Sequence, residues 1–378
     1  MKSQEPSLAQ QRKNDHVQHA LDQHTSHPAN EFDRIRFIHH SFNQTDFDTI
    51  DLSTTWAQHQ HAFPFYINGM TGGSDFTYQF NDKLSHVAQQ TGLAMASGSV
   101  SAALKDLTVA DSYRIIRKNH PTGFILANIG AHHTLENAQR AVDILQADAL
   151  QIHLNIPQEV VMPEGDRDFS QWEENIAQIV EGLTVPVIVK EVGFGMSHET
   201  LAKLTRMGVS TVDISGRGGT NFIQIENERR NTLDFSSLLH WGQTTPESLI
   251  EAQPFIQSQQ LEILASGGIR HFTDIFKAIA MGAQAVGLSG HFLKMVHELG
   301  VDQTVTIVEE WKQGLTHLAL LLGTQTITEL QQHPIMVDAS LAHWAHQRGI
   351  AINHLAQRPH PLSDPTTSPS GFRSPFWV

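Results

Sequence analysis

The feature that most constrains the fold of this chain is a regular alternation, from about residue 63 onward, of short apolar runs with longer amphipathic stretches. Eight runs have the length and composition of strands: residues 63–68, 93–98, 123–130, 149–155, 186–192, 210–215, 262–268 and 285–289. Between them, stretches such as TLENAQRAVDILQ, SHETLAKLTRMG and TDIFKAIAMGA carry apolar residues at three- and four-residue spacing, as helices do. Strands that alternate with helices indicate a parallel sheet.

Eight such units predict an α/β fold, a single (β/α)8 or TIM barrel, in which the carboxyl ends of all the strands face one mouth. We assign residues 61–350 to the barrel. Residues 1–60 form an N-terminal extension, which we expect to be polar and mostly irregular from residue 12, and residues 351–378 form a loose Pro/Ser-rich tail. The connection at 216–245 is unusually long, which is typical of a lid or of disorder.

Composition excludes several classes of function. The formal net charge of −14 makes nucleic acid an unlikely partner, and the absence of cysteine excludes disulfides, thiolate metal sites and thiol catalysis. No secretory signal and no apolar run of membrane-spanning length are present, so we expect a soluble, cytoplasmic protein with no membrane partner. The 24 histidines lack a metal-binding spacing and are interpreted as ordinary surface and core residues.

The last two strands end in ASGGIR and GLSG, the pair of positions at which such barrels commonly bind phosphate. The residues that we expect to hold this phosphate are Gly267, Gly268, Arg270, Ser289 and Gly290. The alternative is that the glycines only permit tight turns with positive φ. A phosphate here would belong either to a substrate or to a cofactor such as flavin mononucleotide (FMN).

The other strand ends favour a cofactor with a planar, polar-edged ring system. They carry small hydrogen-bonding groups at Thr71, Gly72, Gly73, Ser99, Asn128 and Thr220. Lys190 ends the apolar run PVIVKEV, where a buried ammonium needs an anion, and a reduced flavin has negative charge near N1. A salt bridge between Lys190 and Glu191 or Asp213 is the alternative.

Two further stretches suggest how a charged substrate could bind. RKNDH places Arg12, Lys13 and His16 close together, which suits a diphosphate if this segment folds over the mouth, although a solvated polar N-terminus has the same composition. In QIHLNIPQEVVMPEGD, Glu159 could bind Mg²⁺ or serve as an ion-pair partner. Gln158 beside it cannot be a conventional base, because an amide does not titrate near neutrality.

These stretches together resemble the type 2 isopentenyl diphosphate isomerases over nearly all of residues 12–350. The matching motifs are RKNDH, INGMTGGS, HLNIPQEVVMPEGDRDF, PVIVKEVGFGMS, DISGRGGTNFIQIENERR and ASGGIR. The resemblance implies FMN reduced by NADPH, Mg²⁺, and interconversion of isopentenyl and dimethylallyl diphosphate in isoprenoid biosynthesis with no net redox change. It also implies that reduced FMN itself acts as acid and base through N5, and that the chain forms a homotetramer or a larger homo-oligomer.

The resemblance assigns roles to individual residues. Gln158 would contact the substrate and assist proton transfer, and His153 and Asn155 would orient substrate and water. Glu159 would bind Mg²⁺, and the cations of RKNDH would bind the diphosphate. FMN contacts would come from Thr71, Ser99, Asn128, Lys190, Ser215, Thr220, Gly267, Gly268, Arg270, Ser289 and Gly290.

The chain departs from the family in one motif. Many members carry Gln or Arg just behind the Gly-Ser of the second strand, whereas this chain reads GSVSAALKD, so that Ser101 or Lys105 would have to substitute.

Two other functions remain open. FMN-dependent 2-hydroxy acid oxidases and dehydrogenases share the barrel and the phosphate site, but they place a catalytic histidine beside a Gly-Gly-Arg segment. The corresponding SGRGGTN has Arg217 and no histidine, so the base that would take the hydroxyl proton is missing. A non-catalytic flavin-binding barrel is the other alternative, and it would have no use for HLNIPQE or RKNDH.

Overall fold

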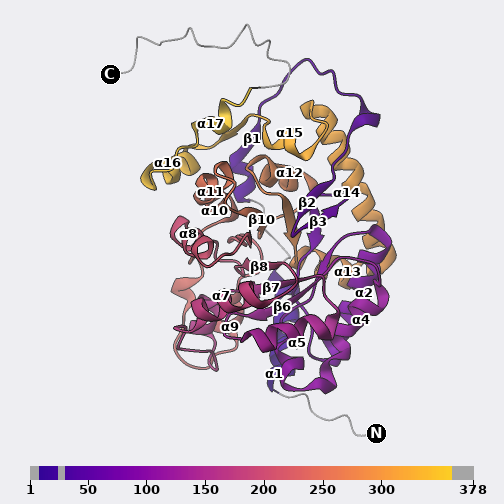
Figure 1. Ribbon diagram of the computed structural model, residues 1–378, viewed down its shortest axis with the longest axis vertical. Coiled ribbons are helices and arrows are strands. Elements are labelled where there is room, and N and C mark those ends of the chain that lie inside the picture. Colours follow the sequence, from indigo (N-terminus) through magenta and orange to yellow (C-terminus); the bar gives the residue numbers. More distant parts are fainter. Residues whose placement is uncertain (1–7, 24–29, 360–378) are drawn as a thin grey trace.

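The computed structural model describes residues 8–23 and 30–359, and its centre is a closed barrel of eight parallel strands (Figure 1). The strands are β4 (Phe65–Ile67), β5 (Met95–Ala96), β6 (Ile125–Gly130), β7 (Ala149–His153), β8 (Val187–Lys190), β9 (Thr211–Asp213), β10 (Glu262–Ser266) and β11 (Ala285–Leu288). Around the barrel they follow in chain order, and β11 pairs with β4 to close it. Each strand lies within one of the eight predicted runs, so the predicted barrel is confirmed.

A helix packs outside the barrel after each strand. In chain order these helices are α2 (Asp75–Thr91), α4 (Asp111–Asn119), α5 (Leu135–Leu145), α7 (Trp172–Gly182), α8 (His198–Arg206), α10 (Thr245–Glu251), α12 (Phe272–Ala280) and α13 (Gly290–Glu298). The shorter helices in the loops are α3 (Ser101–Lys105), α6 (Ile156–Val161), α9 (Phe222–Glu228) and α11 (Gln253–Gln257). Beyond the barrel follow α14 (Gly300–Leu322), α15 (Ile327–Gln331), α16 (Ala339–Gln347) and α17 (Asn353–Ala356).

Strand β7 shows how the alternation of side chains positions polar groups inside the barrel. Leu150 and Ile152 belong to the main apolar core, which also contains residues of the surrounding helices. Side chains alternate across a strand, so Gln151 and His153 point the opposite way, into the barrel. The polar residues of QIHLN thus extend the functional mouth down into the barrel interior.

The amino end of the barrel is filled by the hairpin of β2 (Thr54–Trp56) and β3 (His59–His61). The ring of Trp56 is stacked on His61 with 4.0 Å between centroids, and it also packs against Tyr66 and Phe124. Trp56, Tyr66 and Phe124 belong to a separate apolar cluster with Leu126 and other buried strand residues.

The extension is more regular than we expected. Residues 8–23 form helix α1 (Leu8–Gln23), which contacts α2, α9 and α13 and buries Val17 and Leu21 (Figure 1). Farther along, β1 (Ile35–Phe37) pairs antiparallel with β12 (Ile335–Val337), which joins the extension to the C-terminal part of the chain. The expectation of a mostly irregular extension was therefore wrong for α1, whose helix is stabilised by tertiary contacts.

The long connection at 216–245 is also ordered, because it contains α9 and a short 3-10 helix at Ser236–Leu238. The disorder alternative for this loop was wrong, whereas its role as a lid stays a prediction. Of the predicted loose tail, residues 360–378 lie outside the described part of the chain, as do residues 1–7 and 24–29. None of the described helices is long and apolar enough to cross a membrane.

Candidate functional site

A cavity of about 1340 Å³ opens at the carboxyl ends of the barrel strands and is bordered by α1, α6 and α9. Most of the predicted site residues line it. They are Arg12, Lys13, His16, Ser99, Asn128, His153, Asn155, Gln158, Glu159, Lys190, Ser215, Thr220, Gly267, Gly268, Arg270, Ser289 and Gly290. The fold therefore brings to one cavity predicted residues that are up to 278 positions apart, from Arg12 to Gly290.

The predicted contacts at Thr71, Gly72 and Gly73 are the exception, because these residues lie behind the cavity wall. Thr71 is buried and its hydroxyl bonds to Asn81. A Cβ on Gly72 would lie 2.1 Å from the ring of Tyr113, so this glycine permits close packing. Gly69 and Met70, just before them, line the cavity instead.

The phosphate end of the cavity has the form of an anion cradle. Gly267 and Gly268 have φ values of 93° and 77°, and a Cβ on Gly267 would lie 1.9 Å from the carbonyl oxygen of Gly216. Helix α13 begins at Gly290, and Ser289 before it makes no side-chain capping bond, so the first N–H groups of the helix remain available to an anion. The positive φ values account for the glycines at these turns, and the role in phosphate binding stays a prediction. These residues fit the phosphate of FMN.

A chain of buried polar side chains runs from this mouth into the barrel. His153 Nδ1 donates to Asn128 Oδ1 at 2.8 Å, and Asn128 Nδ2 donates to Gln151 at 3.2 Å. Gln151 donates to Asn68 at 3.1 Å, which in turn donates to the carboxylate of Asp213 at 2.8 Å. Burial holds the pKa of His153 well below its usual value, so the imidazole is neutral near pH 7 and its Nε2 remains an acceptor.

Lys190 is buried at the end of β8 and lines the cavity. Its ammonium donates to the backbone oxygen of Glu191 at 2.7 Å and makes no salt bridge with the carboxylate of Glu191 or Asp213 within the described residues. Instead, Asp213 accepts from Tyr66, Asn68 and Ser266. Burial lowers the pKa of Lys190, and the unpaired ammonium is suited to a bound anion.

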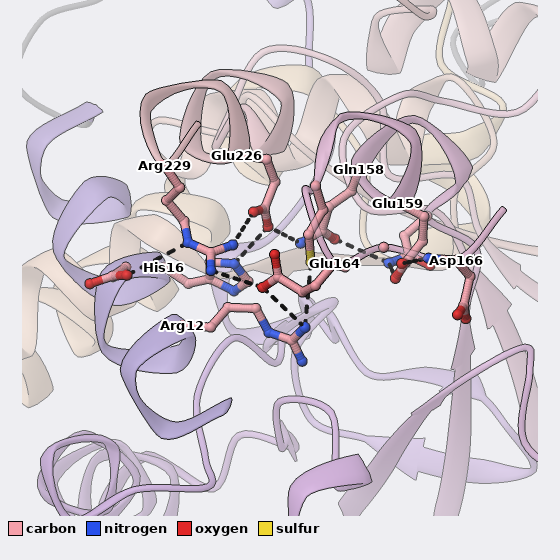
Figure 2. Close-up of polar contacts among 12 residues, drawn as sticks. Arg12, His16, Gln158, Glu159, Glu164, Asp166, Glu226 and Arg229 are labelled. Atoms are coloured by element: carbon pink, nitrogen blue, oxygen red, sulfur yellow. Dashed lines mark hydrogen bonds and ion pairs between the residues drawn. The ribbon is translucent and has the colours of Figure 1, made fainter. Parts of the chain in front are cut away.

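The most extensive network of the site joins α1, α6 and α9 through Glu226 (Figure 2). The side chain of Glu226 is fully buried, and its Oε1 accepts from His16 and from Gln158, each at 2.8 Å. Its Oε2 is paired with Arg229, which also binds Glu164 at 2.9 Å. Burial raises the pKa of Glu226, but the bonds from His16 and Gln158 and the charge of Arg229 outweigh it and hold the pKa at about 2.

The amide of Gln158 is fixed at both ends by this network. Its NH₂ donates to Glu226, and its oxygen accepts from Asn155 Nδ2 at 3.2 Å. Asn155 also donates to Glu159 at 2.8 Å. Three of the four residues predicted from HLNIPQE are thus joined through Asn155 on the cavity wall.

The cations of α1 differ in how they are neutralised. Arg12 lies 3.9 Å from Glu164, whereas Lys13 makes no hydrogen bond or ion pair with any described residue. Burial, reinforced by the nearby charge of Arg12, lowers the pKa of Lys13 to about 7. Both side chains line the cavity, so an anion bound there would find an unpaired ammonium.

Glu159 offers the cavity one carboxylate. Its oxygens accept from Asn155 and from the backbone N–H of Asp166, at 2.8 and 2.9 Å. Among the described residues, no group of three or more histidine or acidic side chains could hold a metal ion. A cation at Glu159 would need further oxygen ligands from substrate or water, as Mg²⁺ commonly does.

The departure at GSVSAALKD places one serine, Ser101, against a histidine. Ser101 Oγ lies 2.7 Å from His133 Nε2 and 2.9 Å from Ser99 Oγ, and both serines line the cavity. Lys105 also lines the cavity and is exposed, with no ion pair among the described residues.

Sequence reasoning missed Glu226, Arg229, Asn68 and Gln151. The signals for the first two were the charged run IENERR and its place in the matching motif DISGRGGTNFIQIENERR, but neither predicts their partners. Gln151 and Asn68 are polar residues in otherwise apolar strand runs, which was the same signal that singled out Lys190.

Comparison with known proteins agrees with this geometry. A family model described as FMN-dependent dehydrogenase matches residues 126–337. Three proteins named isopentenyl-diphosphate delta-isomerase match about 92% of this chain. The one from Staphylococcus epidermidis is 46% identical and covered to 99%, that from Latilactobacillus sakei is 48% identical and covered to 98%, and that from a Streptomyces species is 44% identical and covered to 95%.

Solved structures share the fold at low identity. The flavin-binding domain of baker's yeast flavocytochrome b2 superposes with a TM-score of 0.60 at 18% identity, covering 97% of this chain and 86% of that one. A mandelate oxidase variant has a TM-score of 0.59 at 14% identity, covering 87% of this chain and 95% of that one.

Proposed function

The chain belongs to the FMN-dependent dehydrogenase family and, within it, to the isopentenyl-diphosphate delta-isomerases, and from this membership we propose that it interconverts isopentenyl diphosphate and dimethylallyl diphosphate. The reaction would serve isoprenoid biosynthesis in the cytoplasm, with FMN reduced by NADPH, Mg²⁺ as the metal, and a homotetramer or larger homo-oligomer as the assembly.

The observation that carries the proposal is that one cavity contains two separate regions suited to anions. The glycine cradle at Gly267 and Gly268 fits the phosphate of FMN, and Lys190 fits the anionic ring of the reduced flavin. Arg12 and Lys13, on α1, fit a diphosphate. This separation supports the proposal that a cofactor and a diphosphate substrate bind side by side in the same site.

When bound, reduced FMN would supply the acid–base chemistry, with no net redox change. The chain's own residues orient the groups around it. Gln158 cannot titrate, but its amide is fixed by Glu226 and Asn155, so it can hold the alkene end of the substrate in a constant position. Glu159 would contribute one ligand to Mg²⁺, and neutral His153 would accept a hydrogen bond through Nε2 from substrate or water.

The proposal is tested by incubating the purified protein with isopentenyl diphosphate, FMN, Mg²⁺ and NADPH without oxygen, and measuring product and NADPH together. We expect many molecules of dimethylallyl diphosphate for each NADPH consumed. Product formed in proportion to NADPH would contradict isomerisation. Oxidation of lactate or mandelate without any isomerisation would favour the 2-hydroxy acid oxidase, and FMN binding with neither activity would favour the non-catalytic barrel.

A further inference from the structure

Arg270, the cation predicted to hold the cofactor's phosphate, is already compensated. Arg270 has five N–H donors, and four hydrogen bonds join them to Asp33 and Asp274, at 2.7 to 3.2 Å. Lys277 lies beside them, interacts electrostatically with the carboxylates of Asp33 and Asp274, and donates to the backbone oxygen of Phe32. Two cations and two carboxylates cancel, so this cluster brings no net positive charge to a phosphate on the glycine cradle.

Arg217, which none of the assignments above uses, is an uncompensated cation in the same cavity. Its side chain lines the cavity and makes no hydrogen bond or ion pair with any described residue. Its Nε is fully buried without a partner. A buried guanidinium nitrogen that lacks a partner has lost its water without replacement, and a bound anion would correct this.

The backbone around Arg217 is fixed and lies next to the cradle. The N–H of Arg217 donates to Gln243 at 2.8 Å, which anchors the residue beyond the end of β9. A Cβ on the following Gly218 would lie 3.2 Å from the Cα of Gly268, and one on Gly219 would lie 3.3 Å from the nitrogen of Gly268. The chain that carries Arg217 is therefore in contact with the loop that would bind the phosphate.

We propose that Arg217 supplies the guanidinium that binds the phosphate of the flavin and so makes the site prefer a phosphorylated flavin to riboflavin. This inference rests on the proposed FMN-dependent function. The planar fork of arginine matches two phosphate oxygens at once, which a lysine ammonium cannot do. Lys13 and Arg12 belong to α1 and are left to the substrate's diphosphate.

The test compares FMN with riboflavin, which has the same ring but no phosphate. Dissociation constants of both are measured by flavin fluorescence for the parent protein and for Arg217→Gln, Arg217→Lys and Arg206→Gln. Arg206 is exposed on α8 without an ion pair and controls for the change in net charge. Circular dichroism and thermal melting establish that each variant is folded.

We expect Arg217→Gln to weaken FMN binding by about 10- to 100-fold, as loss of a charge-assisted contact would, and to leave riboflavin binding unchanged. Arg217→Lys should weaken FMN binding by a smaller factor, again without an effect on riboflavin binding. If the glutamine variant does not fold, the lysine variant tests whether Arg217 binds the phosphate. Arg206→Gln should behave as the parent.

Three results would overturn the assignment. Unchanged FMN affinity in a folded Arg217 variant would mean that Arg217 does not bind the phosphate of the flavin. If the KM for isopentenyl diphosphate is raised in the same variant, Arg217 binds the substrate instead. Equal losses for FMN and riboflavin would mean that it contacts the ring or supports the fold. Failure of the parent protein to bind FMN would contradict the proposed function itself. This outcome is distinguishable from a failure of the Arg217 assignment, because it appears before any substitution is made.

Discussion

Replacing Glu226 with glutamine tests whether one buried carboxylate holds α1 at the barrel mouth. The carboxylate accepts from His16 on α1 and from Gln158 on α6, and it pairs with Arg229 one helical turn along α9. Glutamine has almost the same shape. It retains one oxygen for His16 and Gln158 but presents an NH₂ to the guanidinium of Arg229, where an acceptor is needed.

The expected cost follows from these contacts. A hydrogen bond to a charged group contributes about 1.5–3 kcal/mol and a neutral one about 1 kcal/mol. Arg229 keeps Glu164 at 2.9 Å and Asp15 at 3.6 Å, which offsets part of its loss. Of the three altered contacts, only the bond from His16 joins Glu226 to α1, and its acceptor loses its charge. We therefore expect the docking of α1 to weaken by about 1–2 kcal/mol, which is about 5- to 30-fold in the equilibrium between docked and undocked helix.

Amide hydrogen exchange measures this equilibrium directly, because protected amides exchange through opening of the helix. Exchange near Val17 and Leu21 should accelerate by about 5- to 30-fold in Glu226→Gln, while FMN affinity is unchanged. Glu228→Gln is the matched control, since its carboxylate is on the same helix and forms a partly exposed ion pair with His19. That pair is worth at most about 1 kcal/mol, or about 5-fold. Equal protection of α1 in the Glu226 variant and the parent would refute the clamp.

Four further predictions follow from the site. Gln158→Asn, which keeps the amide but shortens its reach, should lower turnover by about 100-fold or more with FMN binding intact, and unchanged turnover would remove Gln158 from the mechanism. Lys190→Ala should lower the reduction potential of bound FMN because an anionic reduced flavin loses its ammonium, whereas an unchanged potential would make Lys190 structural. Because the pKa of Lys13 is lowered to about 7, Lys13 loses its charge as pH rises through 7. The KM for the diphosphate should then increase by up to about 10-fold per pH unit. Lys13→Arg should flatten this pH profile, and an unchanged profile in that variant would contradict the prediction. Glu159→Gln should raise the Mg²⁺ concentration for half-maximal activity by about 10-fold, since an amide oxygen carries no charge, and identical metal dependence would exclude Glu159 as a ligand.

The sequence predicted the barrel because its signals are local. Each strand lies within a mostly apolar run of five to eight residues, and helices such as α5, α8 and α12 have their apolar residues at helical spacing. The phosphate cradle was predictable for a similar reason, since its position after the last two strands is set by the topology. The strand order and the position of the phosphate site are the same in every such barrel, so they could be inferred from one sequence.

The parts that could not be predicted depend on contacts between distant segments. Helix α1 has few apolar residues, and its burial of Val17 and Leu21 against other helices has no strong periodic pattern. Glu226 acquires its role from His16, which is 210 positions away. Thr71 lies behind the cavity wall, where its hydroxyl bonds to Asn81 in α2. The position of Thr71 at the end of a strand does not predict this contact.

The central claim, that the site isomerises a diphosphate by moving protons with reduced FMN, is tested most directly by running the reaction in deuterated water. Isopentenyl diphosphate is incubated without oxygen with the protein, Mg²⁺ and FMN, with and without NADPH, and the product is analysed by mass spectrometry. We predict dimethylallyl diphosphate that carries deuterium and forms only when the flavin is reduced. Product without deuterium, or equal rates with oxidised and reduced flavin, would contradict the account.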